Sequence, residues 1–139
     1  MLIDALMVFL ATVAFGVIFK LPKRALFNSG LAGVAAWGTY QLVFNLVGNR
    51  ISASFFGVVG LTIIAEISAR ILKEPATVFI VAGIIPLVPG VQAYFTMLYL
   101  VEGDYLLGLE QGIEAFLIAG AISAGIVFVG IFTKLGRSE

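Results

Sequence analysis

Long apolar stretches separated by short polar breaks run along the whole chain. They lie at about residues 2–19, 25–48, 53–72, 76–101 and 112–133. Each stretch is long enough to cross a bilayer as an α-helix, because about 20 residues at a rise of 1.5 Å span a hydrocarbon core of ~30 Å. We therefore predict an all-α, polytopic membrane protein in which residues 1–139 form a single transmembrane domain of five helices.

The first stretch is the shortest, and its length is also typical of a signal peptide. Its leader, however, holds Asp4 and no Lys or Arg, and the segment after Phe19 has no small-residue cleavage pattern. Signal peptides have a basic leader and such a cleavage site. We interpret this stretch as a membrane span.

Two prolines interrupt the fourth stretch near its middle. Proline removes a backbone donor and clashes with the preceding turn, so Pro86 and Pro89 should break the helix between Pro86 and Gly90. We expect one half-helix at about residues 75–85 and a second that runs outward from about Pro89. In lipid, the backbone groups freed by such a break are tolerated only against protein or a watery cavity.

The second half-helix would expose its N-terminus inside the membrane. Unpaired N–H groups and the positive end of the helix dipole favour a carboxylate there, an arrangement that recurs in secondary transporters. The alternative is a proline kink that serves packing alone. The candidate substrate-binding residues on this helix are Pro86, Pro89, Gly90, Gln92 and Thr96.

Two amide side chains in the second stretch extend the candidate site. Gln41 and Asn45 are four positions apart and therefore share a helix face, which Trp37 and Asn49 continue. Amides inside a span need hydrogen-bond partners. We weigh two roles for Gln41 and Asn45, interhelical hydrogen bonding and the lining of a substrate path, and include both as candidate substrate-binding residues.

The third stretch holds a carboxylate inside the predicted membrane. Glu66 lies roughly two turns from the end of its span, a depth at which an unpaired carboxylate is costly. Arg70 is one turn further on and can form an i, i+4 ion pair with it. We predict that Glu66 and Arg70 form either a structural ion pair or a gated site for a proton, a coupling ion or a substrate ammonium group, and the roles are compatible.

Small residues mark one face of the fifth stretch. Ala115, Ala119 and Ser123 follow one another at intervals of four, beside Gly120 and Ala124. Small residues let membrane helices approach closely. We expect this face to pack against a neighbouring helix.

Composition narrows the chemistry that the chain can perform. Hydrophobic residues make up 61% of it and charged residues only 12%, against about 25% charged residues in soluble domains. The chain has no Cys and no His, so it lacks a thiolate nucleophile, a disulfide, an imidazole base and the common ligands of zinc. Glu110 and Glu114, one turn apart, are a weak metal signal. We therefore expect no enzyme activity, no metal and no cofactor, and the balanced charge predicts no nucleic-acid partner.

The basic residues indicate how the spans are oriented, because basic residues in short loops stay in the cytoplasm. If alternate loops share a side, Arg50 stands alone on one side. The other side carries Lys20, Lys23, Arg24, Arg70, Lys73, Lys134 and Arg137. We predict an outer N-terminus and a cytoplasmic C-terminus. The acidic residues in or near the outer fourth loop are Glu102, Asp104, Glu110 and Glu114.

Four segments give the chain a family resemblance. They are Ala65-Glu66 with Arg70, Pro75-Ala-Thr-Val-Phe79, Gly83-Ile-Ile-Pro-Leu-Val-Pro-Gly90 and Glu102-Gly-Asp-Tyr105. With them the chain resembles the short, five-span subunit of the split threonine/serine exporter family, and the resemblance covers nearly its whole length. Ala82 departs from the pattern, because many relatives have proline there, but Pro86 and Pro89 are in place.

The resemblance implies an exporter in the plasma membrane that works with a longer membrane subunit, so we expect a hetero-oligomer. Some members of the family are linked to threonine and serine and others to succinate, and each of these substrates has a carboxylate. We therefore expect a subunit of a secondary exporter for a small carboxylate-bearing metabolite. A non-transporting assembly or stabilising subunit is the main alternative, and a membrane enzyme and a small channel are the others.

Overall fold

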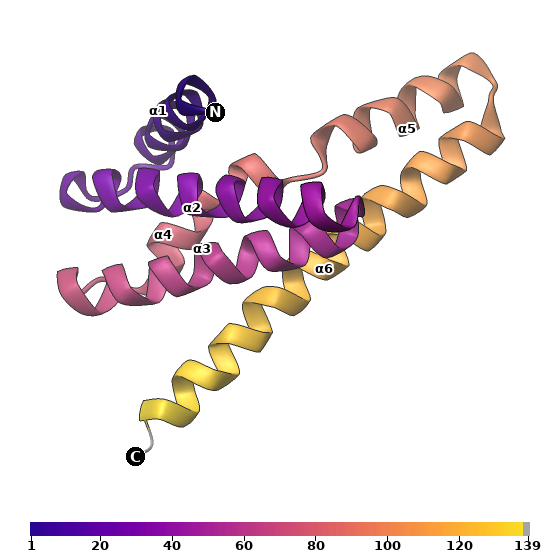
Figure 1. The fold of residues 1–139 in the computed structure, drawn as a ribbon. Coiled ribbons are helices and arrows are strands. Elements are labelled where there is room, and N and C mark those ends of the chain that lie inside the picture. Colours follow the sequence, from indigo (N-terminus) through magenta and orange to yellow (C-terminus); the bar gives the residue numbers. More distant parts are fainter. Residues whose placement is uncertain (138–139) are drawn as a thin grey trace.

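The described residues fold into an all-helical structure, which confirms the predicted all-α class. The computed structural model describes residues 1–137, so residues 138–139 of the predicted domain lie outside it. The elements are α1 (Leu2–Ile18), α2 (Lys23–Val47), α3 (Arg50–Leu72), α4 (Ala76–Gly83), the short 3-10 helix η1 (Ile85–Leu87), α5 (Gly90–Glu102) and α6 (Tyr105–Arg137). Figure 1 shows α2 and α3 side by side, with the hairpin of α5 and α6 extending beyond their ends.

A bundle of α1, α2, α3 and α4 forms the larger part of the fold. α4 packs on α2 and α3, and α1 covers α2 and α4. Fully buried side chains at its centre include Val58, Leu61 and Phe79. The buried face of α2 carries only small residues, namely Ala25, Ser29, Gly30, Ala32, Gly33 and Ala36. These residues let the neighbouring helix backbones approach closely.

Glycines lie where two pairs of helices come closest. A Cβ atom on Gly33 of α2 would overlap the Thr12 side chain of α1. In the same way, a Cβ atom on Gly125 of α6 would overlap the Val58 side chain of α3. A larger residue at either position would therefore force the two helices apart.

α6 contacts α3 through a face other than the predicted small-residue face. The buried residues of α6 that follow this contact are Ile118, Ile122, Gly125 and Val129. The small-residue face is exposed within the described chain at Ala119, Gly120, Ser123 and Ala124, so its packing against a neighbouring helix stays a prediction. Ile118 and Ile122 instead pack with Val58 in the core, and a Cβ atom on Gly125 would overlap Val58.

The connection between α5 and α6 is shorter than the predicted fourth loop. Gly103 ends α5 in the left-handed region with a φ of 88°, and the Asp104 carboxylate accepts a hydrogen bond from the Leu107 backbone N–H at 3.3 Å. A left-handed glycine closes a helix, and an Asp at the cap position opens the next one. As a result, Glu110 and Glu114 lie on α6, whose 33 residues make it ~50 Å long.

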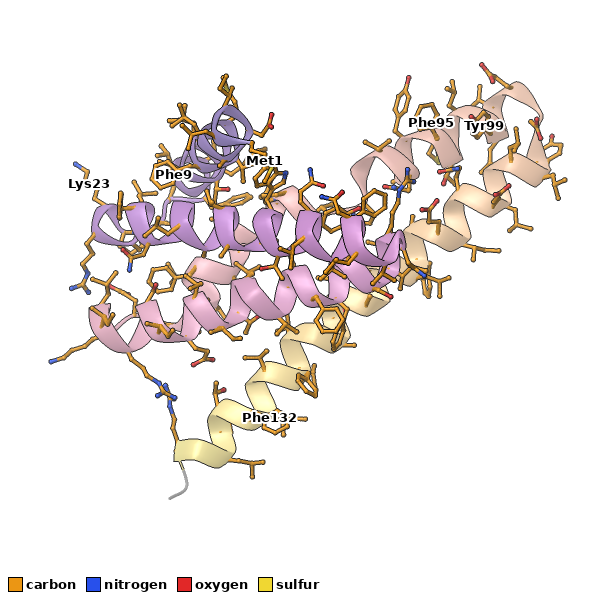
Figure 2. All side chains as sticks on the ribbon, in the orientation of Figure 1. Met1, Phe9, Lys23, Phe95, Tyr99 and Phe132 are labelled. Carbon is orange, nitrogen blue, oxygen red and sulfur yellow. The ribbon has the colours of Figure 1, made fainter. Side chains whose placement is uncertain are left out.

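Two of the described helices, α3 and α6, are long and apolar enough to cross a membrane by length and composition, while α1 is apolar but shorter. In an apolar 18-residue segment of each helix, only 39% of the residues of α3 and 22% of those of α6 are buried within the chain. Side chains also project along the α5–α6 hairpin, where Phe95 and Tyr99 stack with ring centroids 5.8 Å apart (Figure 2). Such extensive apolar surface needs lipid or another protein to cover it. The exposed apolar surface and the two long apolar helices indicate a membrane protein.

We expect Gly125→Ala to destabilise the contact between α6 and α3. The new methyl group would overlap Val58 and lie 3.1 Å from the Phe55 carbonyl oxygen, and overpacking of this kind costs about 1–3 kcal/mol. Gly130→Ala on the same helix is the control, because a Cβ atom there meets no described atom within 4 Å. Thermal unfolding of both purified variants in detergent checks this. Equal melting temperatures would show that α6 does not cross α3 at Gly125.

Candidate functional site

The fourth apolar stretch is interrupted as its prolines predict. α4 ends at Gly83 and α5 begins at Gly90, with the single turn of η1 between them. Short-range hydrogen bonds hold this segment, from the Leu87 N–H to the Ile84 carbonyl at 2.9 Å and from the Gly90 N–H to the Val88 carbonyl at 2.8 Å. Leu87 belongs to the buried core, so the break is anchored inside the bundle.

The first turn of α5 leaves backbone donors without partners. Within residues 1–137, the N–H groups of Val91 and Gln92 have no hydrogen-bond acceptor. The first N–H groups of a helix lack an intrahelical acceptor, and the cap residue here, Pro89, has no side-chain acceptor to offer. A Cβ atom on Gly90 would meet no described atom within 4 Å, so there is open space beside this turn. Free N–H groups at a helix start favour an anion.

A polar cavity of about 390 Å³ lies against this turn. α2, α3, the helix break, α5 and α6 all contribute to its wall. Its lining residues are Trp37, Tyr40, Gln41, Arg50, Ser54, Pro86, Leu87, Val88, Pro89, Val91, Gln92 and Ile118. Four of the candidate substrate-binding residues therefore meet at one cavity, namely Gln41, Pro86, Pro89 and Gln92.

Arg50 is the charged residue of this lining, and Arg50, Tyr40 and Ser54 are not among the site residues expected from the sequence. Arg50 begins α3, where the Asn49 side chain caps the helix. Its guanidinium Nη1 donates to Oε1 of Glu114 on α6 at 3.1 Å. The sequence did hold one signal for Arg50, because it is the basic residue that stands alone on its predicted side of the membrane.

The other candidate substrate-binding residues lie apart from this lining. The Thr96 hydroxyl donates to the Gln92 carbonyl at 2.7 Å, and its side chain lines an apolar groove between α5 and α6. Asn45 is exposed near the end of α2. Gly90 sits at the first position of α5, beside the cavity, without lining it.

The candidate coupling residues Glu66 and Arg70 lie far from the cavity. Arg50 and Glu66 are both on α3, and 16 positions correspond to about 24 Å along a helix axis. Glu66 is partly buried, and no ion pair joins it to Arg70 in the part of the chain that the structure describes. Arg70 instead lines a separate cavity of about 390 Å³ with Phe128 and Phe132 of α6. The pair that the spacing allows is therefore not formed in this conformation.

A larger cavity of about 570 Å³ runs between α5 and α6. Its lining residues carry no charge and are mostly apolar, among them Leu100, Leu109, Ile113, Phe116 and Leu117. The smaller cavity at the break is lined by Arg50, by Gln41 and Gln92, and by the first turn of α5. Small-molecule sites hold a few convergent polar groups in this way, so we take the cavity at the break as the candidate site.

The anchored helix break, the cavity beside it and the exposed apolar faces define a helical membrane protein with a candidate binding cavity. The chain belongs to the threonine/serine exporter family, because the family model described as "Threonine/Serine exporter, ThrE" matches residues 4–132. An uncharacterized protein from Haemophilus influenzae is 32% identical over 143 residues, which cover 94% of this chain and 47% of the relative. The chain thus spans about half the length of this curated relative. No solved structure matches the chain.

We expect Pro86→Ala/Pro89→Ala to insert and assemble normally but to lose substrate-dependent flux. Removing each proline favours a continuous helix by roughly 3 kcal/mol on soluble-helix scales, and a continuous helix has no free N–H groups beside the cavity. Pro75→Ala is the control, because Pro75 caps α4 and does not line the cavity. The measurement is the initial export rate against substrate concentration at matched protein levels. Wild-type kinetics in the double variant would mean that the site lies elsewhere.

Proposed function

We propose that this chain is a subunit of a secondary exporter in the plasma membrane and that the cavity at the helix break binds the carboxylate of a small metabolite. The observation that carries the proposal is that one cavity is lined both by Arg50 and by Val91 and Gln92, whose backbone N–H groups have no acceptor within residues 1–137. Guanidinium groups and helix N-termini both favour carboxylates. The Gln41 and Gln92 side chains add neutral hydrogen-bonding groups to the same wall.

The proposed substrates are threonine, serine and succinate. The name of the family refers to threonine and serine. Succinate is included because some members of the family that the sequence resembles are linked to it. A cavity of about 390 Å³ is at the lower end of the range for small-molecule sites, which suits metabolites of this size. All three substrates present a carboxylate, so the same positive groups would hold any of them.

We propose five spans in the membrane, at the residues expected from the sequence, with α4, η1 and α5 together as the broken fourth span. Figure 1 shows the start of α2 and the ends of α3 and α6 on the same side of the molecule. These ends and the α1–α2 connection carry Lys20, Lys23, Arg24, Arg70, Lys73, Lys134 and Arg137. Arg50 lies at the opposite end of α3. Because basic residues favour the cytoplasm, this side and the C-terminus face inward and the N-terminus faces outward.

A longer membrane subunit is the proposed partner. The matched relative has about as much chain again beyond the region that this chain covers. The hairpin of α5 and α6 exposes apolar side chains that this chain leaves uncovered, among them Val91, Met97, Leu106 and Phe116. Membrane helices associate by packing such surfaces against one another. The hairpin is therefore the part of this chain that we expect the partner to contact.

Uptake into inverted membrane vesicles tests the proposed function, because export from the cell appears there as uptake. Vesicles with this chain, with and without its co-purifying membrane partner, are given radiolabelled threonine, serine and succinate. We expect saturable uptake of at least one probe that requires both chains. Unsaturable flux would indicate a channel. Transport that survives both Arg50→Gln and the double proline substitution would leave this chain as an assembly subunit.

We expect Glu66→Gln to assemble normally and to abolish the response of export to a pH gradient. Glutamine keeps the shape of the side chain but cannot carry a proton, and carboxylates inside membrane spans commonly act in proton transfer. Glu102→Gln, an exposed carboxylate at the end of α5, is the control. Initial export rates with and without an imposed gradient are compared. Gradient-sensitive export by a well-expressed Glu66→Gln variant would leave Glu66 with a structural role only.

A further inference from the structure

The ion pair between Arg50 and Glu114 joins α3 to α6 beside the cavity. Nη1 of Arg50 lies 3.1 Å from Oε1 of Glu114, and the Glu114 side chain is 28% exposed against 49% for Arg50. Ile118, one turn further along α6, lines the cavity. Residues one turn apart share a helix face, so Glu114 approaches Arg50 from the wall that α6 gives to the cavity.

Arg50 places positive charge where a helix disfavours it. It is the first residue of α3, and the N-terminal end of a helix dipole is itself positive. The start of α5 contributes to the same cavity through Val91 and Gln92. A guanidinium and two helix N-termini therefore meet around one space. Among the residues that the structure describes, Glu114 is the carboxylate that forms an ion pair with this positive group.

Glu114 uses only part of the hydrogen-bonding capacity of Arg50. One bond, from Nη1 to Oε1, joins the two side chains, and the guanidinium makes no second hydrogen bond within residues 1–137. A guanidinium has five N–H donors in a planar fork that suits two-point binding of a carboxylate. A free carboxylate in the cavity can therefore bind Arg50 through more contacts than Glu114 makes.

We propose that the Glu114 carboxylate occupies the position on Arg50 that the substrate carboxylate takes when it binds. It holds Arg50 while the cavity is empty and gives up the guanidinium when a substrate carboxylate enters. This inference rests on the proposed function, in which the cavity binds such a group. Glu114 competes with substrate and thereby sets the apparent affinity. Because Glu114 is on α6 and Arg50 is on α3, the exchange also opens a polar link between these helices each time substrate binds.

Competition and simple structural support give opposite results when the carboxylate is neutralised. A competing Glu114 weakens substrate binding, so its removal strengthens binding. A pair that only holds α3 to α6 would instead weaken transport whichever partner is removed, because either removal breaks the link between the two helices. Rebuilding the pair with the charges exchanged would then restore transport.

The test measures saturable uptake of radiolabelled threonine, serine and succinate into inverted vesicles that contain this chain with its partner. We expect Glu114→Gln to lower KM about fivefold, the factor that corresponds to ~1 kcal/mol for a partly exposed ion pair. We expect Arg50→Gln to raise KM about tenfold or more, as for loss of a hydrogen bond to a charged group. Glu110→Gln is the matched control, because Glu110 is exposed one turn before Glu114 and forms no ion pair among the described residues.

The charge-exchanged variant Arg50→Glu/Glu114→Arg separates substrate binding from packing. It rebuilds the ion pair, so it assembles even if a single variant folds poorly, but it moves the guanidinium away from the start of α3. We expect it to assemble without transport. An unchanged KM in Glu114→Gln would overturn the inference and leave the proposed function intact. Restored transport in the charge-exchanged variant would overturn the inference together with the role of Arg50 in the proposed site. No uptake of any probe by the wild-type complex would overturn both the inference and the proposed function.

Discussion

The need to enclose a broken helix within protein governs the rest of this fold. A backbone that lacks regular helical hydrogen bonds is tolerated at membrane depth only inside protein or beside a watery cavity. Here Phe79 and Leu87 bring the segment into the bundle of α1, α2 and α3. α2 meets it with Ala32 and Gly33, and a Cβ atom on Gly83 would lie 3.4 Å from each. Larger side chains on this face of α2 would push α4 and η1 outward and expose the break to lipid.

The same arrangement brings the candidate site together. One side of the break is packed by small residues, and on the other side the chain turns into α5, which packs mainly on α6. The first turn of α5 is thereby left facing a cavity rather than a neighbouring helix. Arg50 and Glu114 meet beside this cavity, where α3 begins and α6 passes. The site is therefore a product of how the helices are placed and not of one sequence motif.

The helix break depends on nearby residues and could be predicted from the sequence, whereas the pairing of side chains could not, whether in the unformed Glu66–Arg70 pair or in the pair of Arg50 with Glu114. Pro86 and Pro89 act on their own backbone, so the break and its half-helices were predictable. Arg50 and Glu114 are 64 positions apart in the chain, so no local sequence pattern predicts that they pair. A stripe of small residues looks the same whether it meets a helix of this chain or faces outward, so the sequence does not say which helix the small-residue face of α6 meets.

The short length of α4 has a consequence for biosynthesis. Its eight residues span ~12 Å and the 13 residues of α5 span ~20 Å, and both are shorter than a hydrocarbon core of ~30 Å. Neither half can cross the bilayer as an independent helix with its backbone ends shielded. As the proposed fourth span, the segment would be stable in lipid only once α1, α2 and α3 are there to enclose it. These three helices precede it along the chain, so the order of synthesis is also the order in which insertion succeeds.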